Sequence, residues 1–253
     1  MIASGSRQQR SASSRLQGSS GLRRKVVSVS NKRLADFRRK LLCWYSLNGR
    51  AFPWRRKSCR PYERIVSEVL LQRTRAETVS AILPRFVRAF PSWQRLARAN
   101  TGQLRRFLKP LGLWRRRASS IRALATEMGQ RRGRFPKRRD EIEQMPGVGQ
   151  YIANAILLFV FKLPSPLLDV NMARVLERRF GKRVLADIRH DPYLQHLSAL
   201  VVAGSKPEEL NWAVLDLGAL VCKTSTPKCE ACPVRVGCKW AESHRQRRSR
   251  KNI

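Results

Sequence analysis

Apolar residues recur along the chain at the three- and four-residue spacing that places them on one face of an α-helix. The first such segment contains Leu34, Phe37, Leu41 and Tyr45. Glycine and proline separate it from the later helical segments, which are expected over residues 65–71, 79–90, 103–108, 119–128, 152–161, 172–180, 194–202 and 208–221. No segment alternates apolar and polar residues as a half-buried strand does. The sequence therefore predicts an all-α fold.

The charge of the chain is strongly unbalanced. Its 253 residues include 53 lysines and arginines but only 17 acids, which gives a formal net charge of +36 at pH 7. Such a charge repels itself and calls for an anionic partner. Nucleic acid is the first candidate; an acidic membrane surface and an arginine-rich proteome are the alternatives. No apolar run reaches the roughly 18 residues that cross a bilayer, so no membrane span is expected.

Basic, polar residues dominate both ends of the chain. Residues 1–30 contain six basic residues and no acid, and they lack the apolar core of a secretory signal. We expect unordered basic tails over 1–30 and 241–253. The expected location is the cytoplasm, at the nucleoid. An organellar transit peptide is the alternative for the first tail, and it keeps organellar import open.

Four of the six cysteines lie close together. Cys222, Cys229, Cys232 and Cys238 follow the pattern C-x6-C-x2-C-x5-C within 17 residues. Disulfides are disfavoured in a chain without a secretion signal. A zinc site and a [4Fe–4S] cluster each take four cysteines, and the ligand count does not separate them. The other two cysteines are expected to pack.

A glycine-rich turn and an aspartate flank the apolar segment 152–163. The turn reads M-P-G-V-G-Q over residues 145–150. Such a turn at the start of a helix presents backbone N–H groups to an anion, although an ordinary interhelical turn has a similar composition. Asp169 stands just before the segment 172–180. It either caps that helix or supplies a carboxylate for chemistry.

These motifs together resemble the endonuclease III superfamily of helix-hairpin-helix DNA glycosylases. The cysteine spacing is similar to the iron–sulfur loop of endonuclease III and the MutY-type adenine glycosylases. The turn and the following L-D-V-N-M-A-R-V at 168–175 resemble the helix-hairpin-helix and Gly/Pro-Asp element. The resemblance extends to S-E-V-L-L-Q-R-T at 67–74, F-P-W-R at 52–55 and P-Y at 61–62, and covers residues 34–240.

The resemblance implies two helical domains and a cofactor. One domain is a six-helix module with the hairpin, over 59–166. The other joins the N-terminal helix and loop, 31–58, to the C-terminal part, 167–240, and carries a [4Fe–4S] cluster. The expected partner is double-stranded DNA with a mismatched or damaged base, bound by a monomer.

The resemblance also assigns catalytic roles. Such enzymes flip the target base out of the stack, and breaking the N-glycosidic bond builds positive charge on the sugar. Asp169 matches the family's catalytic aspartate. Glu68 matches the glutamate that protonates or binds the base, since a carboxyl in an apolar pocket gains proton affinity. A helix-surface glutamate is the alternative for Glu68.

Position 151 distinguishes the branches of the superfamily. Bifunctional members carry a lysine whose amine forms an imine with the sugar, which the phenol of Tyr151 cannot do. MutY-type enzymes usually carry serine, whereas tyrosine is similar to the mismatch thymine/uracil glycosylases. We therefore predict a monofunctional glycosylase that removes thymine or uracil opposite guanine, with Tyr151 in the catalytic site. Ordinary helix packing is the alternative for Tyr151.

The family's DNA contacts map onto three loops. One turn fills the space left by the flipped base, a second loop wedges into the stack, and the hairpin holds phosphate. Basic clusters such as 115–117 are expected to meet further phosphates. The predicted contact residues are Gln72 and Arg73 in the first turn, Leu113, Trp114 and Arg115 in the second loop, and Gly147, Gly149 and Gln150 in the hairpin.

Three other functions stay open. A MutY-type adenine glycosylase without its C-terminal 8-oxoguanine-reading domain shares the neighbourhood of Glu68 and Gln72, but Tyr151 departs from its serine. A DNA-binding protein without catalysis is opposed by the presence of Asp169, Glu68 and all four clustered cysteines. A specialist for a modified base, in phage defence or restriction, is the third.

Overall fold

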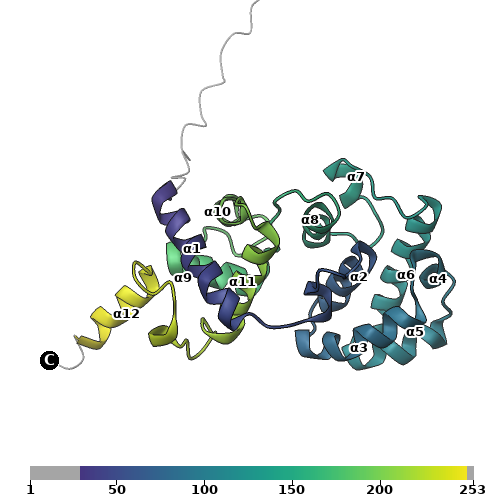
Figure 1. The fold of residues 1–253 in the computed structure, drawn as a ribbon, viewed down its shortest axis with the longest axis horizontal. Coiled ribbons are helices and arrows are strands. Elements are labelled where there is room, and N and C mark those ends of the chain that lie inside the picture. Colours follow the sequence, from purple (N-terminus) through teal and green to yellow (C-terminus); the bar gives the residue numbers. More distant parts are fainter. Residues whose placement is uncertain (1–28, 250–253) are drawn as a thin grey trace, which may run out of the picture.

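The computed structural model describes residues 29–249, which form two helical lobes lying side by side (Figure 1). The predicted tail residues 1–28 and 250–253 lie outside the described part. The α-helices are α1 (Asn31–Asn48), α2 (Pro61–Leu71), α3 (Ala76–Ala89), α4 (Trp93–Ala97), α5 (Thr101–Leu108), α6 (Trp114–Gln130), α7 (Arg139–Glu143), α8 (Gln150–Phe159), α9 (Val170–Phe180), α10 (Pro192–Val202), α11 (Pro207–Leu220) and α12 (Lys239–Ser249). Short 3-10 helices are η1 (Pro53–Arg55), η2 (Lys109–Leu111) and η3 (Cys229–Ala231).

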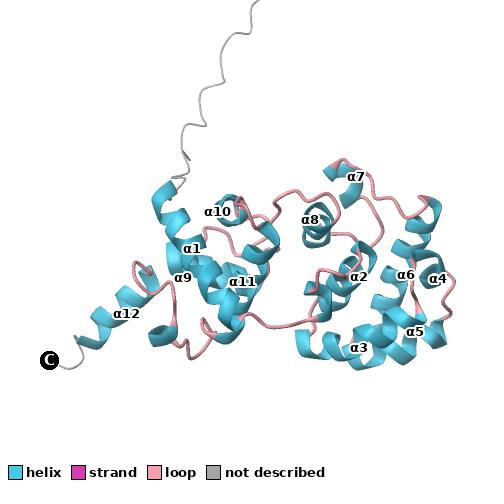
Figure 2. Cartoon of the chain, in the orientation of Figure 1, coloured by secondary structure: helices cyan, strands magenta, loops and turns pink. Residues whose placement is uncertain are grey.

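The predicted all-α class is confirmed, because the described residues contain no strand (Figure 2). Within the same residues, no helix combines the length and the apolar character needed to cross a membrane. The sequence analysis missed α4 and α7, which at five residues each are too short to show a period. The prediction of an unordered tail from residue 241 is wrong, because residues 239–249 form α12. This helix packs on α9, and the Arg178 guanidinium lies 4.8 Å from the Trp240 ring centroid.

Helices α2 to α8 form the first lobe, which we call the hairpin lobe. Its core includes Ile65 of α2, Phe86 of α3, Ile121 of α6 and Ile156 of α8, all fully buried. Helix α2 packs on α8. The turn that follows α2 and the glycine-rich turn that precedes α8 both carry predicted site residues. Close packing of this core therefore fixes where those loops begin.

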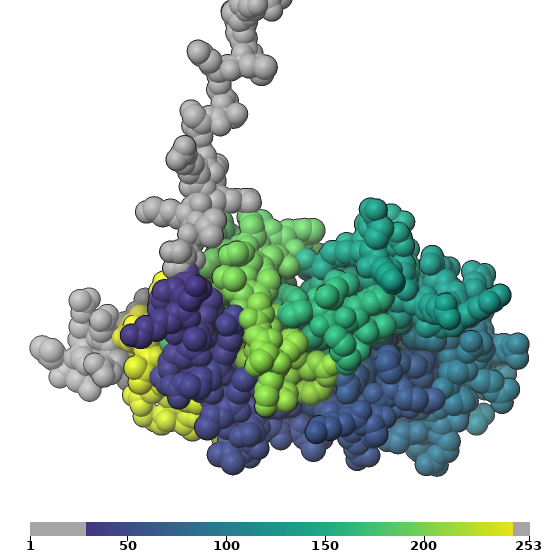
Figure 3. All heavy atoms as spheres, turned by 45° about the horizontal axis from the view of Figure 1, so that its top comes forward, coloured from purple at the N-terminus to yellow at the C-terminus, as the bar shows by residue number. Residues whose placement is uncertain are grey.

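Helix α1 packs with α9 to α12 in the second lobe, which we call the cysteine lobe. Phe37 of α1 meets Phe180 of α9 edge-to-face, with ring centroids 5.2 Å apart. In the space-filling view the purple surface of α1 lies beside the green surface of the later helices (Figure 3). A single core thus joins segments about 130 residues apart in the sequence. The domain boundaries proposed above follow the same pairing and stay predictions.

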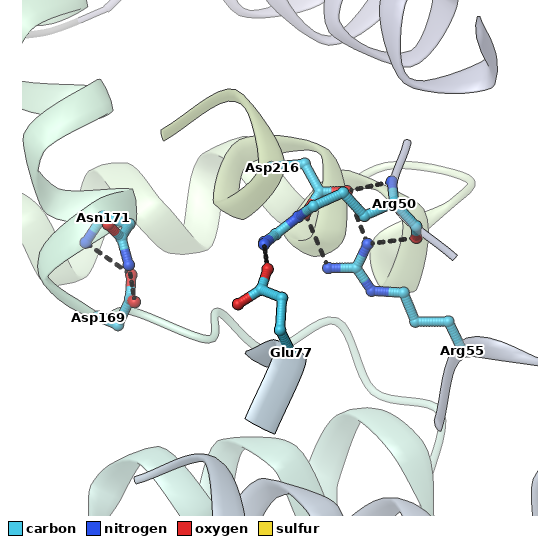
Figure 4. Close-up of polar contacts among 6 residues, drawn as sticks. All are labelled: Arg50, Arg55, Glu77, Asp169, Asn171 and Asp216. Atoms are coloured by element: carbon cyan, nitrogen blue, oxygen red, sulfur yellow. Dashed lines mark hydrogen bonds and ion pairs between the residues drawn. The ribbon is translucent and has the colours of Figure 1, made fainter. Parts of the chain in front are cut away.

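A buried carboxylate joins the two lobes. Asp216 on α11 is fully buried and accepts hydrogen bonds from the backbone N–H of Arg50 at 2.8 Å and from its Nε at 2.8 Å. Arg55, in η1, donates to the same carboxylate through Nη1 at 2.7 Å and Nη2 at 3.1 Å. Arg50 also reaches Glu77 of α3, at 3.1 Å (Figure 4). One carboxylate thereby ties α11 to the segment that enters the hairpin lobe.

A second bridge lies between α2 and α11. The buried Arg64 side chain donates to Glu208 at 2.6 Å, and Lys162 donates to the other oxygen of Glu208 at 2.8 Å. The two bridges hold α11 against the hairpin lobe at two points, Glu208 in its first turn and Asp216 further along the helix. Relative motion of the lobes would require breaking at least one of them.

We predict that Asp216→Asn destabilises the protein by about 3 kcal/mol or more, because it leaves the largely buried Arg55 side chain without its counter-charge and removes one of the two carboxylates that pair with Arg50. The melting temperature should fall by at least about 6 °C in thermal denaturation followed by circular dichroism. The matched control is Asp36→Asn, which removes an exposed ion pair with Arg39 and Lys40 and should lower the melting temperature far less. Equal effects of the two substitutions would contradict a special role for Asp216.

Candidate active site

The glycine-rich turn before α8 has the geometry of an anion-binding hairpin. Gly147 has φ +73°, and a Cβ there would lie 3.2 Å from Cβ of Ser120, so glycine is required. Met145 and Val148 are buried and anchor the turn in the lobe core. Gly149 caps α8 without any side-chain hydrogen bond, so the N–H groups of the first turn stay available to a ligand.

Gln150, the third hairpin residue predicted to touch DNA, is engaged within the protein. Its Nε2 donates to Oε1 of Gln195 on α10 at 3.0 Å. Gln195 in turn donates to the carbonyl of Ile188 at 2.9 Å. The hairpin is therefore also tied to the cysteine lobe, and one of the two amide N–H groups of the Gln150 side chain is already used.

Tyr151 and Glu68 meet across the interface of α8 and α2. The Tyr151 hydroxyl donates to Oε2 of Glu68 at 3.0 Å. The Glu68 side chain is buried, with 3% of the residue exposed, which excludes the alternative of a helix-surface glutamate. Two residues 83 positions apart are thus brought into direct contact.

The environment of Glu68 favours its neutral form. Burial raises the pKa of Glu68 to about 7, against the opposing effects of the Tyr151 hydrogen bond and the Arg55 charge. The charge of Asp169 adds to the increase. Burial and the neighbouring Glu68 also raise the pKa of Tyr151 well above its ordinary value, so that the phenol stays protonated and remains a donor. Glu68 can therefore populate both protonation states near neutral pH.

Asp169 caps α9 and lies near enough for its charge to act on Glu68 and Tyr151. Its Oδ1 accepts from the backbone N–H groups of Asn171 and Met172, both at 2.8 Å, and its Oδ2 accepts from Nδ2 of Asn171 at 2.7 Å (Figure 4). Burial raises the pKa of Asp169, while these hydrogen bonds oppose the rise. Capping and chemistry, the two roles considered from the sequence, are compatible in this position. Three helices, α2, α8 and α9, each contribute one oxygen-bearing group.

A hydrogen-bonded chain leads from Asp169 to the first clustered cysteine. Arg174 donates through Nη2 to Oδ1 of Asn171 at 2.9 Å and to the carbonyl of Gly218 at 2.8 Å, and through Nε to the carbonyl of Cys222 at 2.8 Å. The sequence analysis assigned no role to Arg174, although it lies five residues after Asp169 in the quoted motif. Two of its three acceptors are backbone carbonyls from distant segments, which leave no local pattern.

The four clustered cysteines line one pocket. All four are free thiols. Arg178 donates to Sγ of Cys222 at 3.4 Å, and its carbonyl accepts from Cys238 at 3.3 Å. Burial and the other three cysteines raise the pKa of Cys232 to about 11. In residues 29–249, no three His, Cys, Asp or Glu side chains converge as the ligands of a single metal ion do.

The predicted wedge residues lie on two neighbouring exposed loops. Gln72 and Arg73 form the turn between α2 and α3, and Leu113 precedes α6 with 62% of the residue exposed. Trp114 differs, since it is half-buried and packs on the lobe core between two arginine side chains. The second of these, Arg115, is exposed. The structure thus brings Gln72, Arg73 and Leu113 together at one surface, whereas the Trp114 side chain is held against the lobe core.

Comparison with known proteins gives consistent matches. Residues 66–185 match the model of the HhH-GPD superfamily base excision DNA repair proteins. A thymine/uracil-DNA glycosylase of Pyrobaculum aerophilum is 37% identical over 204 residues, which cover 78% of this chain and 88% of that protein. An adenine DNA glycosylase of Buchnera aphidicola is 34% identical, but the match covers 58% of its length. The solved structure of a thermostable thymine-DNA glycosylase aligns with a TM-score of 0.77 at 29% identity, over 84% of this chain and 98% of that one.

We predict that Glu68→Gln stabilises the protein at alkaline pH. A folded-state pKa of about 7, above the ordinary 4.5, means that the unfolded chain gives up this proton first, so the native protein loses stability as pH rises from about 4.5 through 7. Glutamine cannot ionise and still accepts from Tyr151. The gain in unfolding free energy should grow from near zero at pH 5 to roughly 3 kcal/mol at pH 8.

Urea denaturation at several pH values measures this difference. The control is Glu141→Gln, an exposed residue whose substitution should give a small, pH-independent change. A Glu68→Gln effect that does not vary with pH would show that Glu68 titrates normally in the folded protein.

Proposed function

Since the chain belongs to the HhH-GPD superfamily of base excision DNA repair proteins, we propose that it is a monofunctional DNA glycosylase that hydrolyses the N-glycosidic bond of a thymine or uracil mispaired with guanine. The observation that carries this proposal is the hydrogen bond between Tyr151 and the buried Glu68, beside Asp169. The similarity to thymine/uracil and thymine glycosylases supports the choice of target base.

The three groups suit the charges that develop when a base leaves. The sugar becomes positive, and the Asp169 carboxylate, held by Asn171, is placed to stabilise that charge and to orient the attacking water. The departing base becomes negative, and neutral Glu68 is the group able to donate a proton to it, because its pKa of about 7 keeps a protonated fraction at neutral pH.

Tyr151 accounts for the expected lack of strand cleavage. Its phenol points at Glu68, stays protonated and offers no amine for imine formation with the sugar. The product should therefore be an intact strand with an abasic site. The same hydrogen bond keeps the Glu68 carboxyl in one orientation while the base is held in the site.

Double-stranded DNA is the partner that fits the surface. The free N–H groups of the α8 first turn, after Gly149, suit a phosphate. The exposed side chains of Gln72, Arg73 and Leu113 are placed to enter the stack and replace the flipped base. We propose that one chain binds as a monomer, because both lobes contribute to the same site.

The cysteine pocket fits a [4Fe–4S] cluster. A single zinc ion needs sulfurs that converge to about 2.3 Å from it, and such convergence is absent from the described residues. The grouping of all four thiols around one pocket, at a spacing that resembles the family's cluster loop, supports the larger group. When bound, the cluster would cross-link the loop from Cys222 to Cys238 and leave no open coordination position for hydrolysis. Arg178 would then meet a cluster ligand through Sγ of Cys222.

The activity is tested on end-labelled duplexes with one G·T, G·U, A·G or A·8-oxoguanine pair, each reaction being split and alkali added to one half. We expect breaks at thymine or uracil only after alkali. Asp169→Asn should lower the single-turnover rate at least 100-fold, on the order expected for loss of a catalytic carboxylate. The exposed Asp140→Asn is the matched control and should keep the wild-type rate.

Each alternative has its own signature in this assay. Cleavage only at adenine would place the chain with the adenine glycosylases despite Tyr151. Breaks without alkali would overturn the monofunctional assignment. Wild-type protein that is inactive on all four duplexes would refute the proposed substrate.

The cofactor is tested by chemical analysis of protein purified without oxygen. We expect about four iron and four sulfide ions per chain, as a [4Fe–4S] cluster requires. Cys232→Ser should lower both, whereas Cys43→Ser, which changes an exposed cysteine outside the pocket, should not. One zinc ion per chain without sulfide would overturn the assignment.

A further inference from the structure

The two loops that carry Arg73 and Leu113 share an uncommon backbone conformation. Arg73 has φ +55° and Leu113 has φ +49°, so both lie in the left-handed region. A side chain other than glycine costs about 1 kcal/mol or more there and keeps the conformation only if its surroundings enforce it. Both residues are exposed, so their own side chains do not supply that support.

Arg117 on α6 supplies the support for the first loop. Its Nη1 donates to the carbonyls of Val69 and Leu70 at 2.9 and 3.0 Å. Its Nη2 donates to the carbonyl of Gln72 and to Oγ1 of Thr74, both at 3.0 Å. One guanidinium thus holds the last turn of α2 and both sides of Arg73.

The same residue is also part of the second loop. The backbone N–H of Arg117 donates to the carbonyl of Leu113 at 3.0 Å, which forms the first hydrogen bond of α6. Thr74 adds a direct link between the loops, because its Oγ1 lies 3.4 Å from the carbonyl of Leu111. Arg117 therefore touches one loop with its side chain and the other with its backbone.

Burial sets Arg117 apart from its neighbours. The sequence grouped it with Arg115 and Arg116 as a cluster facing phosphate, but only 8% of Arg117 is exposed, whereas the other two are exposed. Within the described residues no carboxylate pairs with it, and its Nε has no partner. A guanidinium taken out of water for three backbone carbonyls and one hydroxyl, without a counter-charge, is costly, although its charge suits the negative end of α2.

We propose that Arg117 is a positioning residue that joins the Gln72–Arg73 turn and the Leu113 turn into one rigid wedge, so that both enter the duplex together and keep the target base out of the stack. This inference rests on the proposed function. A lysine would keep the charge but cannot span four acceptors with a single ammonium group. Methionine would remove all four hydrogen bonds at similar length.

The test compares Arg117→Met and Arg117→Lys with Arg122→Met, which changes an exposed arginine on the same helix. Unstacking is followed by the fluorescence of 2-aminopurine placed beside a G·U pair, on binding of protein that carries Asp169→Asn to prevent excision. We expect Arg117→Met to lose most of the fluorescence increase and Arg117→Lys to keep part of it. Arg122→Met should match the parent protein.

Excision rates separate positioning from a general structural role. For uracil opposite guanine, Arg117→Met should lower the single-turnover rate at least 10-fold, since a displacement of about 1 Å can cost far more. For uracil opposite an abasic site, where no partner base resists flipping, the loss should shrink to less than about 3-fold. Arg117→Lys covers the case in which Arg117→Met does not fold.

An equal loss on both substrates would show that Arg117 only stabilises the fold, and unchanged fluorescence would show that the loops act independently. Either result overturns the proposal. Wild-type protein that unstacks the mispair but excises nothing would instead refute the proposed enzyme activity and leave the wedge in place.

Discussion

The placement of the two lobes depends on the burial of Asp216 between Arg50 and Arg55. Burying a carboxylate costs several kcal/mol unless its oxygens are fully used, and here both oxygens accept two hydrogen bonds each. This geometry can be reached in only one arrangement of α11 against the segment leading to α2. Because Glu68 belongs to the hairpin lobe and Asp169 caps α9 of the cysteine lobe, this interaction contributes to setting the distance between the two acids.

Carboxylates are scarce in this chain, and the buried ones are used differently. Asp216 faces two arginines, while Asp191 accepts from the backbone N–H groups of Val184, Leu185 and Leu194, each at 2.7 Å. Glu68 has only the phenol of Tyr151 as a hydrogen-bond partner. A buried acid with so little support holds its proton near neutral pH. The nearby Arg55 donates hydrogen bonds to Asp216 and not to Glu68, so that the pKa of Glu68 stays raised.

The sequence was informative where chemistry follows a local pattern. Periodicity predicted the long helices, and motif spacing predicted that Glu68, Tyr151 and Asp169 belong to one site; the structure brings these side chains together, while their catalytic roles stay predictions. It was uninformative where a contact joins distant segments. Nothing near Arg117 in a run of three arginines marks it as buried, because its acceptors are carbonyls more than 40 residues away. Arg174 was overlooked for the same reason.

The pairing of α1 with α9 and α11 also has a consequence for how the chain is made. The hairpin lobe is continuous in sequence and can pack as soon as it has left the ribosome, since its contacts are mainly local. Helix α1 is synthesised first, but its partners Phe180 and Leu217 follow more than 130 residues later. Its apolar face, including Phe37 and Leu41, therefore stays exposed to solvent during most of synthesis. This helix is thus a segment that a chaperone would need to cover.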